Sequence, residues 1–228
     1  MQNLRRVRSF VLRAGRVTAG QQRALQQLWP QLGIEFEARP LDLDAVFGRR
    51  ARRCLEIGFG IGECIGSLAE SHREADYIGI EVHRPGVGAL LLRAEKSGLT
   101  NLRVICHDAV EVLAGQVPPG SLDEILVFFP DPWHKKRHHK RRLIGPEFVH
   151  SLAIALQADG ILRLATDWEE YAAQMVGVCN AEPFLASLSA TGDYVPRPDF
   201  RPATRFERRG ERLGHGVWDL AYRRRSAT

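Results

Sequence analysis

Residues 54–63 read CLEIGFGIGE, a short apolar run that ends in a glycine-rich turn. Ile65, Leu68 and Ala69 follow at helical spacing, so this stretch predicts a strand, a turn and a helix. The alternation continues, with short apolar runs at 77–80, 102–106, 124–129 and 161–165 and a closing one at 216–220. Alternating strands and helices are typical of a parallel sheet. The sequence therefore predicts an α/β fold with a mostly parallel sheet.

The first fifty residues lack this alternation. We predict that residues 1–50 form a basic N-terminal extension, partly helical or mobile, and that residues 51–228 form the main domain. At 228 residues and 44% hydrophobic, the chain can bury the core of one such domain. Its longest purely apolar run, 125–129, is too short to cross a bilayer, and its start has no apolar stretch of signal-peptide length, so we expect a cytoplasmic protein. The four cysteines lack CxxC spacing, which favours reduced core residues.

The glycine turn after the first strand is a candidate ligand-binding loop. Gly58, Gly60 and Gly62 have no side chains, so backbone N–H groups can approach a bound molecule closely. A dinucleotide-binding fingerprint would place its third glycine at position 63, but Glu63 stands there and Glu56 precedes the turn. Carboxylates disfavour a phosphate-bearing cofactor. They suit S-adenosylmethionine, which has no phosphate and carries a sulfonium and an ammonium group.

Further carboxylates follow the next two strands. Glu81 stands where an acidic side chain can accept hydrogen bonds from ribose hydroxyls, and Asp108 could accept from the adenine amino group. Each carboxylate alone could be a solvated loop residue. Because ligands of parallel sheets bind at the carboxyl ends of the strands, the joint placement of these residues favours a cofactor site.

The segment Phe129-Pro130-Asp131-Pro132-Trp133 follows the fourth predicted strand. Its two prolines fix the turn around Asp131 and reduce what must be ordered on binding. Asp-Pro after a strand is also an ordinary turn, and Trp133 could be a core residue. A rigid carboxylate beside an indole ring nevertheless suits the binding of a flipped nucleic-acid base, which can stack on the indole. We therefore interpret Asp131 and Trp133 as functional.

Residues 134–142 read HKKRHHKRR, with six permanent cations in nine positions. Like charges repel, so such a cluster is favourable only where contacts with a polyanion offset the repulsion. We therefore predict a nucleic-acid partner. The net charge of the chain is only +5, so the basicity is local. Arginines between 205 and 225 could add a second basic strip or be a solvated surface. His134, His138 and His139 do not predict a metal site, because the surrounding cations repel a divalent ion and no nearby carboxylate joins them.

Six motifs resemble one known family: LEIGFGIGE, GIEVHRPGV, HDAVEV, FFPDPWHKKRHHKRR, ATDWEEYA and TRFERRGERLGHGVWDL, which start at residues 55, 79, 107, 128, 165 and 204. They are similar to the bacterial tRNA (guanine-N7-)-methyltransferase (TrmB) family from Cys54 to the C-terminus. The resemblance implies a class I S-adenosylmethionine-dependent methyltransferase fold, Rossmann-like, with a mostly parallel seven-stranded sheet and an N-terminal extension. It implies methyl transfer to N7 of a guanine in tRNA, in the variable loop.

The resemblance also implies roles for individual residues. It implies a catalytic role for Asp131. Cofactor binding is expected from Glu56, Gly58, Gly60, Gly62, Glu81, Asp108 and Asp131. Substrate binding is expected from Lys135, Asp167, Thr204, Arg205, Phe206 and Glu207, and RNA contacts from Arg137, His138, His139, Lys140, Arg141 and Arg142.

The chemistry of guanine suggests what Asp131 would do. Guanine N7 has an exposed lone pair and no proton, so the transfer needs no base at N7, and positioning should supply most of the rate. Asp131 would orient the base through the guanine N1–H and amino group and stabilise the positive charge that develops on the ring. Glu207 could share that task.

Several alternatives remain open from the sequence. Asp167 and Glu170 have the spacing of a capping box, so Asp167 could simply begin a helix. The protein could methylate another RNA base, such as an adenine amino group, or a small molecule. It could also be an RNA-binding protein without catalysis.

Overall fold

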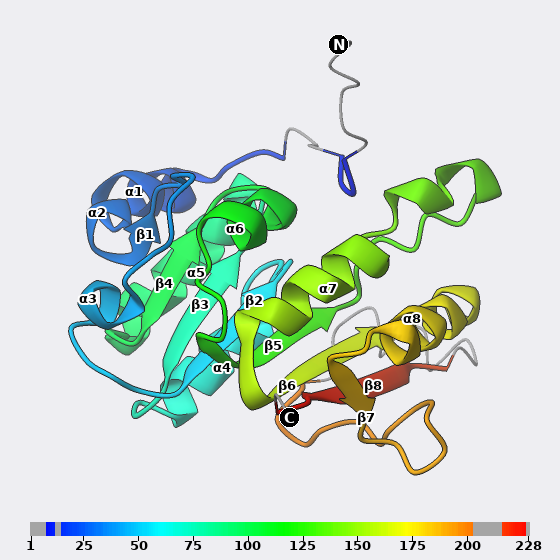
Figure 1. Cartoon of the computed structure of the whole chain (residues 1–228). Helices are drawn as coiled ribbons and strands as arrows, with labels where there is room; N and C mark the ends of the chain where they lie inside the picture. Colours follow the sequence, from blue (N-terminus) through cyan, green and yellow to red (C-terminus); the bar gives the residue numbers. More distant parts are fainter. Residues whose placement is uncertain (1–7, 12–14, 203–215, 227–228) are drawn as a thin grey trace, which may run out of the picture.

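The computed structural model describes residues 8–11, 15–202 and 216–226, and these form one sheet between two layers of helices (Figure 1). The sheet has the strand order β1-β4-β3-β2-β5-β6-β8-β7. The strands are β1 (Gly33–Ile34), β2 (Arg53–Ile57), β3 (Asp76–Ile80), β4 (Leu102–Ile105), β5 (Leu122–Phe128), β6 (Leu156–Thr166), β7 (Leu185–Ser187) and β8 (Trp218–Arg224). The helices are α1 (Ala19–Gln27), α2 (Trp29–Leu32), α3 (Leu43–Phe47), α4 (Glu63–Ser71), α5 (Arg84–Ser97), α6 (Ala109–Gly115), α7 (Pro146–Ala155) and α8 (Glu169–Ala181), with a 3₁₀ helix, η1 (Lys136–Arg141).

Strands β1 to β6 pair in parallel, and β8 pairs antiparallel with β6 and β7. The predicted α/β fold with a mostly parallel sheet is therefore confirmed. The expected count of seven strands is wrong for the described part of the chain, which has eight. The additional strand is β1, a two-residue edge strand that pairs with β4. Two residues carry no periodicity, so this strand leaves no signal in the sequence.

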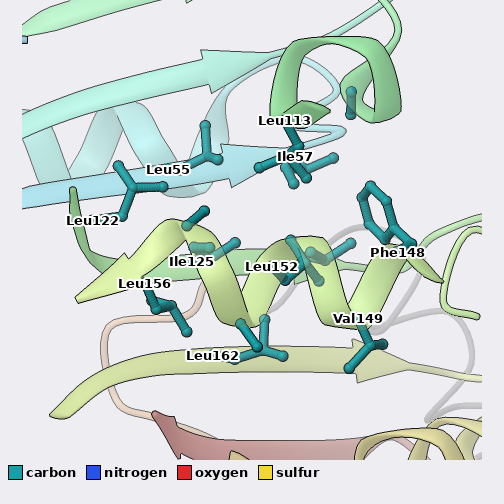
Figure 2. Packing of buried hydrophobic residues seen from close by; sticks show 14 of the residues in the cluster. Leu55, Ile57, Leu113, Leu122, Ile125, Phe148, Val149, Leu152, Leu156 and Leu162 are labelled. Atoms are coloured by element: carbon teal, nitrogen blue, oxygen red, sulfur yellow. The ribbon is translucent and has the colours of Figure 1, made fainter. Parts of the chain in front are cut away.

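Side chains of β2 alternate between the two faces of the sheet and so enter two separate cores. Leu55 and Ile57 lie in the core that α3, α6, α7 and α8 cover. Figure 2 shows side chains of α7, among them Leu152, close to these residues and to Ile125 of β5. Cys54 lies in the other core, with residues of α1, α4 and α5. Glu56 has the same parity as Cys54, so its carboxyl group faces the α4 side.

Helix α1 joins the second of these cores. Thr18 and Gln21 form a capping box at its start, and Ala24 and Leu25 are buried. The helix packs against α5. The domain boundary near residue 50 stays a prediction, but α1 and β1 tie much of residues 19–34 to the sheet and its helices.

The order of the strands reverses direction at the centre of the sheet. From β2 the chain moves to β3 and β4 on one side, then crosses to β5 and β6 on the other. Open α/β sheets bind ligands beyond the carboxyl ends of the strands at such a switch point. The loops that follow β2, β3, β4 and β5 therefore form the expected binding edge. Within the described residues, no helix has the length and apolar character needed to span a membrane.

Candidate functional site

A cavity opens where β2, β3, β4 and β5 end. Its wall includes Gly58 after β2, Glu81 after β3, Asp108 after β4 and the stretch 129–131 after β5. The structure thus brings together four loops that are spread over more than seventy residues of sequence, from position 58 to position 131. Three carboxylates face one space there, and none of its lining residues among the described part of the chain is Lys or Arg. Such a space suits a ligand that carries positive charge and no phosphate.

The three glycines of the β2 turn have left-handed backbone conformations, with φ of 73° at Gly58, 60° at Gly60 and 79° at Gly62. Added Cβ atoms at Gly58 and Gly60 would meet nothing within 4 Å, so both border open space. A Cβ at Gly62 would lie 2.6 Å from Cδ1 of Leu90. Gly62 therefore serves the packing of α4 against α5. Of the three glycines, Gly58 lines the cavity, whereas Gly60 and Gly62 do not.

The Glu81 carboxylate links two loops of the cavity wall. Its Oε2 accepts a hydrogen bond from the Gly60 N–H at 2.9 Å, and its Oε1 accepts from Val82 and His83 at 2.7 and 2.9 Å. Asp108 accepts from the Val110 N–H at 3.0 Å and so caps α6. A carboxylate offers about four acceptor sites, so both groups are held in place and keep acceptor capacity for a ligand.

Glu56 occupies a different environment from the other predicted cofactor ligands. Its side chain does not line the cavity, is only 4% exposed, and has no hydrogen-bond partner for Oε2 within the described residues. Burial raises the pKa of Glu56 to about 8, and the nearby Glu81 charge adds to the rise. At neutral pH, Glu56 is therefore mostly protonated in the folded protein.

This raised pKa predicts a pH dependence of stability. Between the ordinary pKa of 4.5 and about 8, folded Glu56 holds a proton that the unfolded chain has lost. The free energy of unfolding therefore falls as pH rises through this window, by up to a few kcal/mol in total. We expect Glu56→Gln, which cannot titrate, to gain stability relative to the wild type from pH 5 to pH 8 in urea unfolding. A difference that is constant over this range would contradict the prediction.

Asp131 lies between two strained residues. Phe129 and Trp133 have positive φ of 53° and 46°, a conformation that costs side-chain-bearing residues of the order of 1–3 kcal/mol and persists only where the surroundings enforce it. The flanking prolines restrict the chain further. Asp131 itself is exposed at the cavity. The loop is thus held rigid around an accessible carboxylate.

The indole of Trp133 is held by two parts of the chain. Its Nε1–H donates to the Ser9 carbonyl at 2.9 Å, and the Arg141 guanidinium lies 4.2 Å from the centre of its ring. Ser9 and Phe10 also line the cavity. Sequence reasoning missed both residues, because the segment 8–11 carries no pattern that points to the loops it contacts.

The basic segment divides into exposed and buried cations. Lys135, Lys136, Arg137 and Lys140 are exposed, while His138, His139 and Arg141 are half-buried. Arg142 is buried, donates to the Pro132 carbonyl at 2.8 Å and to Oε1 of Gln174 at 2.7 Å, and lies over the Tyr171 ring. Arg142 therefore ties the loop after β5 to α8 and presents no free guanidinium surface to RNA. A charge run in a sequence does not distinguish such an anchor from its solvated neighbours.

The loop after β6 approaches the same area. The His134 and Trp168 rings meet edge to face at 4.1 Å, which brings the loops after β5 and β6 together. Trp168, not Asp167, is the N-cap of α8, and it makes no side-chain capping bond. The capping-box alternative for Asp167 is therefore wrong, and its substrate role stays a prediction. Thr204, Arg205, Phe206 and Glu207 lie outside the described residues.

Comparisons with known proteins agree with this fold. Residues 50–220 match a family model described as "Putative methyltransferase". The 16S rRNA methyltransferase KamB has a similar fold, with a TM-score of 0.59 and 16% identity over 80% of this chain and 94% of its own. A 16S rRNA (adenine(1408)-N(1))-methyltransferase from Catenulisporales acidiphilia, solved with its cosubstrate SAM, gives a TM-score of 0.55 and 17% identity over 85% of this chain and 93% of its own.

Curated relatives are much closer in sequence. The tRNA (guanine-N(7)-)-methyltransferase of Aeromonas hydrophila subsp. hydrophila is 56% identical over 97% of this chain and 93% of its own length. The protein of the same name from Sodalis glossinidius is 57% identical over 96% of this chain and 92% of its own length. With such identity along nearly its whole length, the chain belongs to the tRNA (guanine-N(7)-)-methyltransferase family.

Proposed function

We propose that the protein transfers the methyl group of S-adenosylmethionine to N7 of a guanine in the variable loop of tRNA. One observation carries the proposal: Asp131 joins a cavity lined by carboxylates to an exposed cationic segment four residues further on. The cavity suits a cationic cofactor, and the segment suits a phosphate backbone. A methyltransferase acting on nucleic acid needs both, with the acceptor base between them.

The cavity fits the cofactor on its own geometry. The open space beside Gly58 admits a ligand against the backbone, and Glu81 and Asp108 line the same cavity, where they can accept hydrogen bonds from ribose hydroxyls and the adenine amino group. When bound, S-adenosylmethionine supplies a methyl group on a positively charged sulfonium. The three cavity carboxylates favour that charge by direct attraction.

The chain's own contribution is positioning and charge. Asp131 accepts from the guanine N1–H and amino group, which presents N7 to the methyl donor and selects guanine over adenine. Its negative charge also stabilises the positive charge that develops on the purine during transfer. Lys135 and the exposed cations beyond it hold the phosphate backbone near the base. Since the relatives are bacterial proteins and tRNA is the substrate, we propose that the protein acts in the cytoplasm.

A product assay tests the proposal. The purified protein is incubated with labelled S-adenosylmethionine and unmodified bulk tRNA, the RNA is digested, and the labelled nucleoside is identified by mass and chromatography. We expect 7-methylguanosine, mapped to the variable loop by sequencing. Label on another nucleoside would assign a different base. No label on RNA would leave two alternatives, a small-molecule acceptor or an RNA-binding protein without catalysis. Binding of S-adenosylhomocysteine would favour the first, and no binding would favour the second.

A further inference from the structure

A buried arginine lies next to the strained end of β5. Arg201 is 1% exposed and belongs to the irregular segment that follows β7. Its Nε and Nη2 donate to Oδ1 and Oδ2 of Asp219 at 3.0 and 2.8 Å. Asp219, on β8, is 5% exposed. A buried charge is costly unless it is paired, and Asp219 supplies the carboxylate that pairs with this one.

The guanidinium also contacts the aromatic residues before the Asp131 turn. Its central carbon lies 5.7 Å from the ring centre of Phe128 and 5.3 Å from that of Phe129, within the range of cation–π attraction. Both aromatic residues line the cavity, whereas Arg201 does not. Arg201 therefore acts on the cavity wall from outside, through Phe128 and Phe129.

Backbone pairing links Phe129 to Asp219 through β6. The Phe129 N–H donates to the Ala165 carbonyl on β6 at 2.8 Å, and Ala165 is the cross-strand partner of Asp219 on β8. Arg201 closes this connection by reaching from Asp219 back to Phe129. Phe129 holds a positive φ of 53°, which needs support from its surroundings. Among the described residues, the Arg201 guanidinium is a charged group in contact with the Phe129 ring and so is placed to give that support.

We propose that Arg201, paired with Asp219, is a positioning residue that holds Phe129 in its strained conformation and so sets the place of Asp131. The expected loss of methyl-transfer rate rests on the proposed function, whereas the expected loosening of the loop at Phe129 does not. The planar guanidinium of Arg201 spans a carboxylate and two aromatic rings at once. A lysine keeps the charge but cannot make the bidentate pair with Asp219.

The first test is Arg201→Lys, with Arg49→Lys as a matched control. Arg49 pairs with the buried Asp76 at the start of β3, at the amino edge of the sheet. We expect Arg201→Lys to lower kcat for tRNA between about tenfold and a hundredfold, because small misplacements of reacting groups cost this much, with little change in the dissociation constant of S-adenosylhomocysteine. Arg49→Lys should lose stability but keep its kcat. Equal kcat in Arg201→Lys and wild type would overturn the proposal.

A second variant separates positioning from simple stability. In Arg201→Met/Asp219→Leu, an apolar pair replaces the buried ion pair, an exchange that often leaves stability unchanged or improves it. We expect its unfolding midpoint to be near that of the wild type while kcat stays low, because the contact with Phe129 is not restored. Recovery of wild-type kcat in this variant would show that only stability matters.

Hydrogen exchange gives a readout that does not depend on catalysis. In Arg201→Lys without ligand, the peptide covering 128–134 should exchange faster than in the wild type, while a peptide covering 76–80 in β3 should be unchanged. Unchanged exchange at 128–134 would overturn the proposal even if methyl transfer proves to have another acceptor. Faster exchange there with no methylation of tRNA by the wild type would instead refute the proposed function alone.

Discussion

Asp131→Ala is expected to lower kcat for tRNA methylation by at least about a hundredfold, the usual cost of removing one group that stabilises developing charge. The carboxylate is exposed at the cavity, in a loop that two prolines and two strained residues hold in place. The variant therefore loses both the orientation of guanine and the stabilisation of the cationic product ring. The measurement is single-turnover methyl transfer at saturating tRNA and cofactor, which separates chemistry from binding.

The affinity of the Asp131→Ala variant for S-adenosylhomocysteine should fall much less, because Glu81 and Asp108 also line the cavity. Its affinity for tRNA should change little, because phosphate contacts supply most of the binding free energy and the removal of a negative charge near the cationic segment offsets the lost contact with guanine. Asp131→Asn provides a second test, because an amide can accept one hydrogen bond from guanine but carries no charge. Glu147→Gln, which alters an exposed carboxylate on α7, is the matched control and should keep the full rate. An unchanged rate of methyl transfer in Asp131→Ala would contradict the catalytic role of Asp131.

The parts of the fold that could be predicted are those with a local signature. Each βα unit carries its own apolar run and its own helical stripe, so β2 to β6 appear in the sequence without knowledge of the tertiary structure. The carboxylates of the cavity were also predictable as a set. Because parallel strands end at the same edge of the sheet, Glu81, Asp108 and Asp131 had to come close together once that topology was inferred.

Pairings between residues distant in sequence could not be predicted. Arg201 and Asp219 form a pair only because the segment after β7 returns to the end of β8 that pairs with the carboxyl end of β6. The placement of Ser9 beside Trp133 likewise joins positions 124 residues apart. Neither pair shows any periodicity, and both are polar contacts between distant segments that local patterns do not encode.

Burial is the second feature that the sequence did not indicate. Glu56 precedes the glycine turn, as the prediction required, but the alternation of β2 directs it toward α4 and not into the cavity. Arg142 looks like its neighbours in the basic run, yet it is buried and bonded to Pro132 and Gln174. The sequence shows that a charge is present, but whether the charge serves a ligand or the fold depends on which side of the chain faces the core.

The other large effect is expected at the exposed cations. Arg137→Gln/Lys140→Gln should weaken tRNA binding roughly tenfold at about 0.1 M salt, and should reduce the slope of log affinity against log salt by about 2, because two phosphates are no longer neutralised. Both side chains lie in η1 and are exposed. Neither makes a hydrogen bond or ion pair that would tie it to the described part of the fold, so stability should not change. Fluorescence anisotropy with labelled tRNA from about 50 to 200 mM salt measures both quantities.

A matched pair of cations distinguishes local contact from general charge. Arg50→Gln/Lys96→Gln removes one arginine and one lysine that are also exposed, before β2 and at the end of α5, at the amino edge of the sheet. If tRNA is held by the general positive charge of the surface, both double variants should bind tRNA more weakly by a similar factor. If the RNA backbone contacts the cations beside Asp131, only Arg137→Gln/Lys140→Gln should bind more weakly. At saturating tRNA, the first variant should keep its kcat, since these cations hold the backbone and do not touch the reacting atoms. Equal salt slopes for the two double variants would place the RNA elsewhere on the surface. Unchanged turnover and an unchanged KM for the methyl acceptor in Arg137→Gln/Lys140→Gln would favour a small-molecule acceptor.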